Sequence, residues 1–344
     1  LAAFHHAAAV ADPQSAFGTS GTIHATVSAN LKNLLEHAGS ADDPAALMRL
    51  NDGSRRALQH LAPRFAERHR LGFIRECHGD LHGRNIAWWR GQLTPFDALE
   101  FDPALRWIDV MDDLAFVFMD LVARGHADFA HELLNAYLDA GGDYAGLRLL
   151  RFYAVYRALV RAKVDGLQRE GTWVEAQRRE LQDRKQQRLR VALEMIAAPK
   201  PALLLMHGLP GSGKTWLSER LIGRLPAVRV RSDVERKRLF GLSATEHSHS
   251  AVGGGLYGQA ATEQTYAQVL DCARAALEGG FTVIVDAAFA DAPQRRPFRQ
   301  LACDLGCAFM ILHCEATDEV LTARVAARQS RGDDASEAGL DVLR

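Results

Sequence analysis

The sequence predicts two domains, a mainly α-helical domain over residues 1–196 and an α/β domain with a parallel sheet over residues 197–344. Three observations support this prediction. Helical periodicity dominates the first half, the segment AAPKPA at 197–202 interrupts it with two prolines, and short apolar runs then alternate with helical patterns. Prolines in such a segment mark a junction, and strand–helix alternation is typical of a parallel sheet with crossover helices.

The first domain is expected to begin with helices and loops over residues 1–70. A hairpin follows, in which NIAWWR and LTPFDALEF are joined by a turn at Gly91 and Gln92. Residues 107–124 are apolar on nearly every face, which predicts a buried helix. An amphipathic helix over 147–167 and a charged helix over 174–196 complete the domain. Basic and acidic residues alternate in the last helix, which favours a solvated face over a binding patch.

The second domain is expected to alternate between strands and helices. Four apolar runs predict the strands, and three longer periodic segments predict the helices. The strands are expected at ALLLMHG (202–208), AVRVRS (227–232), FTVIVDAAF (281–289) and AFMILHC (308–314), and the helices at 213–225, 257–279 and 291–306. Gly279 and Gly280 supply a C-terminal stop for the longest of these helices.

Composition narrows the classes of partner. The chain of 344 residues has 41 basic and 42 acidic residues, a net charge of −1. A near-neutral surface argues against extended contact with nucleic acid. No apolar run approaches the roughly 18–20 residues of a membrane span. Five cysteines, an odd number without a signal peptide, indicate reduced thiols. We therefore expect a cytoplasmic protein that does not bind membranes.

The stretch GLPGSGKT fits the pattern G-x-x-x-x-G-K-[ST] and stands between an apolar strand and a helix, the context that supports this motif. Backbone amides of such a turn and the helix N-terminus wrap phosphate groups. Lys214 would neutralise the transferred phosphoryl oxygens, and the Thr215 hydroxyl would bind Mg²⁺. The expected nucleotide-binding residues are Gly208, Leu209, Pro210, Gly211, Ser212, Gly213, Lys214 and Thr215.

Two acidic residues stand at the ends of later strands. Asp233 follows AVRVRS and could accept a proton from a substrate hydroxyl, cap a helix that starts at Val234 together with Ser232, or do both. Asp286 ends an apolar strand, where it would bind Mg²⁺ or its water or act only as a turn residue. Downstream arginines could close over ATP as a lid, although an exposed helix would carry them anyway. They are Arg324, Arg328 and Arg331.

Taken together, these residues resemble the small P-loop kinases of the polynucleotide-kinase and gluconate-kinase type, over about residues 200–344. The resemblance implies that the domain binds ATP and Mg²⁺ and transfers the γ-phosphoryl group to a hydroxyl. It implies catalytic roles for Lys214, Asp233, Arg324 and Arg328 and metal binding by Thr215 and Asp286.

A second motif lies in the first domain. CHGDLHGRN is followed, after the hairpin, by PFDALEF. This layout resembles the catalytic loop of protein-kinase-like enzymes, and in particular the aminoglycoside phosphotransferase family, over roughly residues 1–190. The resemblance implies the helical C-lobe of that fold, in which Asp80 orients and deprotonates the acceptor hydroxyl. Asn85 and Asp97 would hold Mg²⁺. Asp109, with Asp113 nearby, matches a buried acidic position that anchors the loop.

The first domain departs from that family before His78. The 77 preceding residues read as helix and loop, and their only lysine is Lys32, so the glycine-rich N-lobe with its ATP-gripping lysine is missing. Because the first residue is Leu1 and the last residues are GLDVLR, we expect a fragment truncated at both ends. The order of the two halves resembles bacterial fusions of an aminoglycoside phosphotransferase-like domain and a P-loop ATP-binding domain.

The sequence therefore predicts an ATP-dependent kinase that acts on an alcohol group. Its partners would be ATP, Mg²⁺ and a small polar metabolite as phosphate acceptor, and the P-loop domain is the one expected to be active. The alternative is a regulatory ATP-binding or ATPase protein whose degenerate kinase-like domain docks a partner.

Overall fold

The computed structural model describes residues 1–39, 42–197, 200–244, 246, 248, 254–331 and 335–337. Contacts divide the chain into two compact units. The first unit comprises Leu1–Ala130 and Leu149–Ala198, and the second comprises His131–Arg148 and Pro199–Arg344. Residues 131–148, which lie before the boundary expected from the sequence, therefore group with the second unit.

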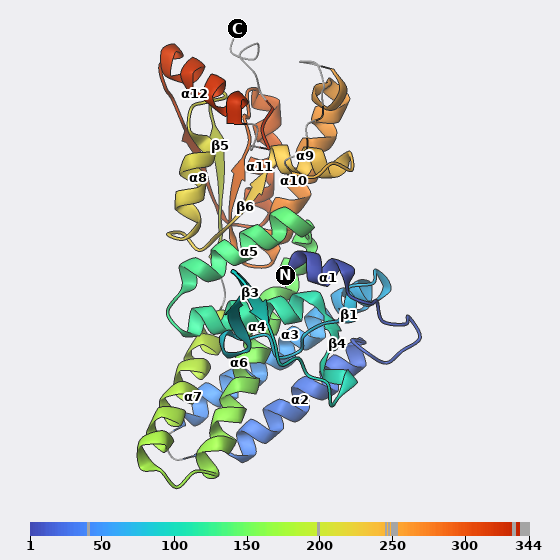
Figure 1. The fold of residues 1–344 in the computed structure, drawn as a ribbon, viewed down its shortest axis with the longest axis vertical. Coiled ribbons are helices and arrows are strands. Elements are labelled where there is room, and N and C mark those ends of the chain that lie inside the picture. The colour runs from blue at the N-terminus through green and yellow to red at the C-terminus, as the bar shows by residue number, and fades with distance from the viewer. Residues whose placement is uncertain are drawn as a thin grey trace. The chain divides into compact units, whose positions relative to one another are not determined.

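The first unit is mainly helical (Figure 1). Its helices are α1 (Ala2–Ala7), α2 (Ser20–Glu36), α3 (Pro44–Arg70), α4 (Val110–Ala123), α6 (Leu147–Glu170) and α7 (Glu175–Ile196), with 3₁₀ turns η1 (Gly83–Asn85) and η2 (Pro103–Leu105). Its strands are β1 (Ile74–Glu76), β2 (Ile86–Trp89), β3 (Gln92–Pro95) and β4 (Trp107–Asp109). Within the described part of the chain, no helix combines the length and apolar character that crossing a membrane requires.

Helix α4 confirms the buried helix expected from the apolar run, but it begins later. Residues 107–109 form β4 instead, which pairs antiparallel with β1 so that Ile74 lies opposite Asp109. A short apolar run has the same composition in a buried strand and in a buried helix, so periodicity did not separate them. The β1–β4 pair matters for the site because the loop that follows β1 carries the HGD motif.

The expected hairpin is present with a shifted turn. Strands β2 and β3 pair from Ile86 opposite Pro95 to Trp89 opposite Gln92. The two turn residues are therefore Arg90 and Gly91, with φ of +48° and +80°, one position before the expected turn. Hairpin turns of this length favour positive φ at both central residues because that twist matches the strands.

The second unit is an α/β structure. Its strands are β5 (Ala202–His207), β6 (Ala227–Arg231), β7 (Thr282–Asp286) and β8 (Ala308–His313). Its helices are α8 (Lys214–Ile222), α9 (Ser232–Leu239), α10 (Gln259–Glu278), α11 (Ala292–Asp304) and α12 (Asp318–Arg331), with 3₁₀ turns η3 (Tyr144–Gly146) and η4 (Gly255–Tyr257). Helix α5 (Ala127–Gly141) begins in the first unit and contributes its residues from 131 onward to the second.

The four strands of the second unit form one parallel sheet in the order β6-β7-β5-β8, which confirms the sheet expected from the sequence. Figure 1 shows α8 on one side of this sheet and α10 and α11 on the other. On the α8 side, Leu204, Met206 and Ile284 pack against Leu217 and Leu221. The alternate strand residues are buried on the opposite side, as period-two side chains require.

Residues of α5 bind the edge strand β6. Asn135 Nδ2 donates to the Ala227 carbonyl over 2.9 Å, and its Oδ1 accepts from the Arg229 amide over 2.6 Å. The Tyr144 hydroxyl donates to the Arg229 carbonyl over 3.3 Å. An edge strand presents unpaired amides and carbonyls, and here side chains from residues 131–148 satisfy several of them. The segment is therefore a structural part of the α/β unit.

We expect Asn135→Ala to destabilise the α/β unit by about 2–4 kcal/mol, because a strand amide and a strand carbonyl would stay buried without partners. Asn135→Asp should cost at least as much, since a buried carboxylate still accepts from the Arg229 amide but faces the Ala227 carbonyl without a proton to donate. Amide hydrogen exchange of β6 and β7 at fixed pH measures the effect. Unchanged protection in Asn135→Ala would show that the segment is dispensable.

Candidate functional site

The carboxyl ends of all four parallel strands of the second unit meet at one edge of the sheet. The glycine-rich turn follows β5, helix α9 follows β6, Asp286 ends β7, and His313 ends β8. A cavity of about 1210 Å³ opens at this edge. It is lined by Pro210–Leu217, Arg231–Asp233, Arg236, Tyr257, Tyr266, Asp286–Ala288, His313–Glu315, Arg324, Ala327, Arg328, Ser336 and Glu337. Ligands of open parallel sheets bind in this position.

The turn from Gly208 to Gly213 requires glycine. Gly211 and Gly213 have φ of +82° and +99°, a region that L side chains rarely adopt. A Cβ on Gly208 would lie 2.3 Å from the Cys314 carbonyl oxygen, and one on Gly211 would lie 2.9 Å from that of Leu321. The turn therefore packs directly against backbone that follows β8. Ser212 is buried in the cavity wall, and no partner for its Oγ exists among the described residues.

Lys214 lies over this turn at the start of α8. Its ammonium group donates to the carbonyl oxygens of Gly208 and Leu209 over 2.7 and 2.9 Å. Burial lowers the pKa of the ammonium group, and the nearby Asp286 and Asp233 carboxylates oppose that change. The cation thus stands between the turn and two acidic side chains.

Thr215 and Asp286 are brought together by the packing of α8 on the sheet. Thr215 and Asp286 both line the cavity, and the Thr215 side chain favours the ionised form of the Asp286 carboxylate. Ser218 Oγ lies 3.2 Å from Asp286 Oδ2. Arg229 Nη1 lies 3.4 Å from the same Ser218 hydroxyl. Burial raises the pKa of Asp286, against the opposing charges of Arg231 and other nearby cations. A hydroxyl and a carboxylate of this kind fit Mg²⁺, which prefers oxygen ligands.

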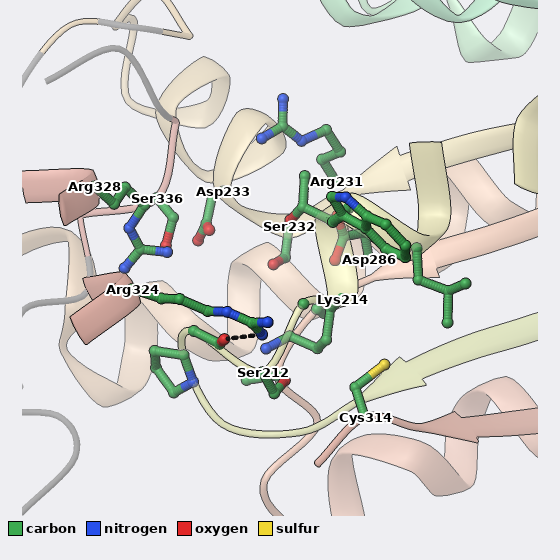
Figure 2. Close-up of a pocket in the computed structure, with 18 of the residues that line it drawn as sticks. Ser212, Lys214, Arg231, Ser232, Asp233, Asp286, Cys314, Arg324, Arg328 and Ser336 are labelled. Carbon is green, nitrogen blue, oxygen red and sulfur yellow. Dashed lines mark hydrogen bonds between the residues drawn. The ribbon is translucent and has the colours of Figure 1, made fainter. Parts of the chain in front are cut away.

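Asp233 lies in the first turn of α9 and faces the cavity together with Lys214, Arg324 and Arg328 (Figure 2). The alternative role as a helix cap is wrong. Helix α9 begins at Ser232, and Arg231 occupies the cap position. Asp233 is half-buried. Because Arg231 holds the cap position, the Asp233 carboxylate is not needed to cap the helix.

Arg324 and Arg328 approach the glycine-rich turn from α12. Arg324 Nη1 donates to the Gly211 carbonyl over 3.2 Å, the bond drawn in Figure 2. Arg328, one turn later on the same helix, also lines the cavity. The side chain of Arg331 lies outside the described residues.

Several residues at the site carried no motif in the sequence. Tyr257 and Tyr266 line the cavity from η4 and α10, and the fully buried Ser218 contacts the Thr215 carbonyl and the Asp286 carboxylate. Ser218 stands three positions after Thr215, so helical spacing places both hydroxyls on one face. That spacing could have identified Ser218. The tyrosines had no such signal because their approach depends on how α10 crosses the sheet.

The loop after β1 holds the HGD motif of the first unit. Asn85 Nδ2 donates to Asp80 Oδ2 over 3.1 Å and also to the Asp80 carbonyl. His82 Nε2 lies 3.3 Å and Arg161 Nη1 lies 3.9 Å from the Asp80 carboxylate. Burial opposes ionisation of Asp80, but its hydrogen bond with His82 and the charges of His82 and Arg161 outweigh this effect and lower its pKa.

Buried charges anchor this loop. Asp113 accepts hydrogen bonds from the amides of His78 and Gly79 over 3.2 and 2.9 Å and lies 3.1 Å from His5 Nε2. Arg157 bonds to Asp112 over 2.7 Å and donates to the Gly79 carbonyl. Buried ionic groups need such partners. The loop is therefore held to α4 and α6 by charge-assisted hydrogen bonds.

The hairpin returns the chain to Asn85, since the Phe96 amide donates to the Asn85 carbonyl over 2.9 Å. Asp97, the next residue, is exposed and has φ of +61°. Asn85 itself is buried beneath this return. The hairpin thus returns the chain to the loop that holds Asp80 and Asn85.

Gly211 of the glycine-rich turn and Gly241, which follows α9, form a matched pair of glycines for a test. Gly211→Ala should displace the turn from α12 and weaken binding of ATP with Mg²⁺ by more than tenfold, because its Cβ would collide with backbone. Gly241→Ala is the control: its φ is +74° and no atom lies within 4 Å of the added Cβ, so it carries only the roughly 1–2 kcal/mol of left-handed strain. Calorimetric titration compares them, and equal affinities would contradict the packing argument.

The burial of the Asp286 carboxylate can be tested through the pH dependence of the protein's stability. Since burial raises its pKa, the folded state binds this proton more tightly than the unfolded state, so its contribution to stability is present at low pH and lost as pH rises through the folded pKa. Asp286→Asn should therefore melt at a higher temperature than wild type at pH 7.5 without nucleotide, with a smaller difference at pH 4. A lower melting temperature at pH 7.5 would contradict this account.

Comparison with known proteins shows what the second unit is similar to. Residues 203–344 match the family model described as an AAA domain. Uncharacterized proteins of Mycobacterium tuberculosis and Mycobacterium bovis are 31% identical to the chain over 307 residues, which cover 89% of the chain and 61% of each relative. The chain thus spans less than two thirds of the length of these curated relatives. Residues 203–344, which hold the glycine-rich turn and the parallel sheet, are therefore similar to AAA domains.

Proposed function

We propose that the second unit is an ATP-dependent kinase that transfers the γ-phosphoryl group to a hydroxyl of a small polar metabolite. The observation that supports this most is that the glycine-rich turn, Asp233 and Asp286 line one cavity. A site for binding ATP alone needs the turn and the metal-binding groups. An additional half-buried carboxylate beside Lys214 is what a transfer reaction needs.

The proposed reaction uses side chains of this unit for each requirement of phosphoryl transfer. Amides of residues 208–215 and the Lys214 ammonium group bind the β- and γ-phosphates. Asp233 accepts the proton of the acceptor hydroxyl, whose oxygen bonds to the γ-phosphorus while the bond to the β–γ bridging oxygen breaks and ADP leaves. Arg324 and Arg328 stabilise the charge on the transferred group and exclude water.

Mg²⁺ is the metal that this proposal requires, and Thr215 and Asp286 are the residues that would hold it. Bound there, the cation would neutralise phosphate charge. The Ser218 hydroxyl and Arg229 keep the Asp286 carboxylate in place through the contacts at 3.2 and 3.4 Å. Asp286 needs this support because its burial disfavours the ionised form that binds a cation.

The test separates binding from transfer. With labelled ATP and a panel of hydroxylated metabolites, wild type should produce a labelled acceptor. Lys214→Ala should lose both nucleotide affinity and transfer. Asp233→Asn should keep its affinity for ATP with Mg²⁺ and lose transfer by about 10²–10⁴-fold, the usual contribution of a general base.

Asp271→Asn, an exposed aspartate on α10, is the charge-matched control and should keep wild-type activity. The alternative of a regulatory ATP-binding or ATPase protein predicts a different pattern, in which Lys214→Ala abolishes turnover of ATP and Asp233→Asn leaves it unchanged. That second pattern would overturn the assignment of Asp233 and with it the kinase proposal.

We further propose that the first unit derives from the helical lobe of a kinase-like phosphotransferase, with Asp80 as its base and Asn85 and Asp97 as its metal ligands. The support is the loop cluster around Asp80, where Asn85 donates to the carboxylate over 3.1 Å and cations lower its pKa. A lowered pKa keeps Asp80 ionised, as a proton acceptor must be.

A further inference from the structure

Seven lysine and arginine side chains are buried in the described part of the chain. Six of them have a carboxylate within 4.0 Å. They are Arg68, Arg157, Lys185, Arg188, Arg229 and Lys237. The seventh, Arg236, is only 7% exposed, and no carboxylate of the described residues lies within that distance of its guanidinium group. Buried charges are normally paired because desolvation of an isolated ion is costly.

Neutral groups fix Arg236 in place. Its Nη1 donates to the Leu256 carbonyl over 2.6 Å and lies 3.3 Å from the Thr262 hydroxyl. Its guanidinium carbon lies 5.0 Å from the centre of the Tyr257 ring, a cation–π contact. Its Nε is buried, and within the described residues it has no hydrogen-bond partner. The side chain is therefore ordered by neighbours that do not neutralise it.

The unpaired cation lines the same cavity as the glycine-rich turn. Arg236 follows Asp233 by three residues on α9, so both side chains lie on one face of the helix about one turn apart. Tyr266 also lines this cavity. Its hydroxyl oxygen accepts a hydrogen bond from the Phe289 amide over 3.1 Å, which leaves the hydroxyl proton to be donated elsewhere.

We propose that Arg236 is the anion-binding residue of the phosphate-acceptor site, so that the acceptor is a small hydroxylated anion that carries a carboxylate or a phosphate group. This proposal rests on the proposed kinase function and names its substrate class. The anion supplies the missing counter-charge for the guanidinium group. The hydroxyl then lies one helical turn away at Asp233, toward the glycine-rich turn. Tyr257 and Tyr266 border the anion, and Tyr266 offers one further donor.

The spacing between Asp233 and Arg236 on α9 limits the size of the acceptor. Side chains three residues apart on a helix are about 5–6 Å apart at Cβ, so the reacting hydroxyl and the anionic group would be separated by only a few bonds. A neutral polyol would leave Arg236 uncompensated and should bind weakly. Glycerate and glycerol 3-phosphate have the required combination of groups, and glycerol is their neutral counterpart.

Calorimetry on the full chain tests the proposal. The protein is first saturated with Mg²⁺ and a non-hydrolysable ATP analogue, whose binding is measured separately, and is then titrated with glycerate, glycerol 3-phosphate or glycerol. At least one anion should bind at least tenfold more tightly than glycerol. Arg236→Gln should weaken that anion by about 10- to 100-fold, as expected for the loss of a charge-assisted hydrogen bond, without changing the affinity for the analogue.

Arg236→Lys, which keeps the charge, should restore part of the affinity, and Arg299→Gln, an exposed arginine on α11, should leave it unchanged. The preference between glycerate and glycerol 3-phosphate shows whether the acceptor's anionic group is a carboxylate or a phosphate. Three results would overturn the proposal: equal binding of anions and glycerol, anion affinity unaffected by Arg236→Gln, or loss of analogue affinity in that variant. Failure of the analogue to bind wild type would instead refute the kinase function itself.

Discussion

The close approach of the glycine-rich turn to the backbone after β8 is the constraint on which the second unit depends. Because a Cβ on Gly208 would lie 2.3 Å from the Cys314 carbonyl oxygen, the turn fits only where β5 and β8 pair in their observed register. That fit directs the turn's amides and Lys214 toward the edge at which the other strands end. The sheet thus positions the phosphate-binding groups before any ligand is present, which reduces the entropy cost of binding.

Buried charge is the second organising feature, and it supports a candidate site in each of the two units. In the first unit, Asp113 and the Arg157–Asp112 pair bind backbone of the HGD loop. In the second unit, Arg229 supports Ser218 and through it Asp286. In each case a charge buried without such contacts would be unfavourable, so the same interactions that satisfy it also fix a candidate site residue. Arg236 differs because no carboxylate of the described residues pairs with it. In our proposal an anionic ligand supplies that counter-charge.

The edge strand β6 links the site to a distant part of the chain. Asn135 binds the backbone of β6 at Ala227 and Arg229, and Asp233 and Arg236 follow that strand on α9. The segment 131–148 therefore supports the strand from which the acceptor side of the cavity begins. A P-loop unit without this segment would leave part of an edge strand unpaired, which disfavours a single ordered structure.

The sequence by itself determined the motif residues, the parallel sheet and the alternation of strands and helices in the second unit, because glycine spacing and apolar periodicity are local properties of the chain. It also indicated Lys214, which the glycine-rich motif contains, and Asp286, which ends an apolar run. Only the tertiary structure decided the rest. Whether Arg236 has a counter-charge and which strand Asn135 binds depend on residues far away in the sequence, and such pairings leave no local periodicity.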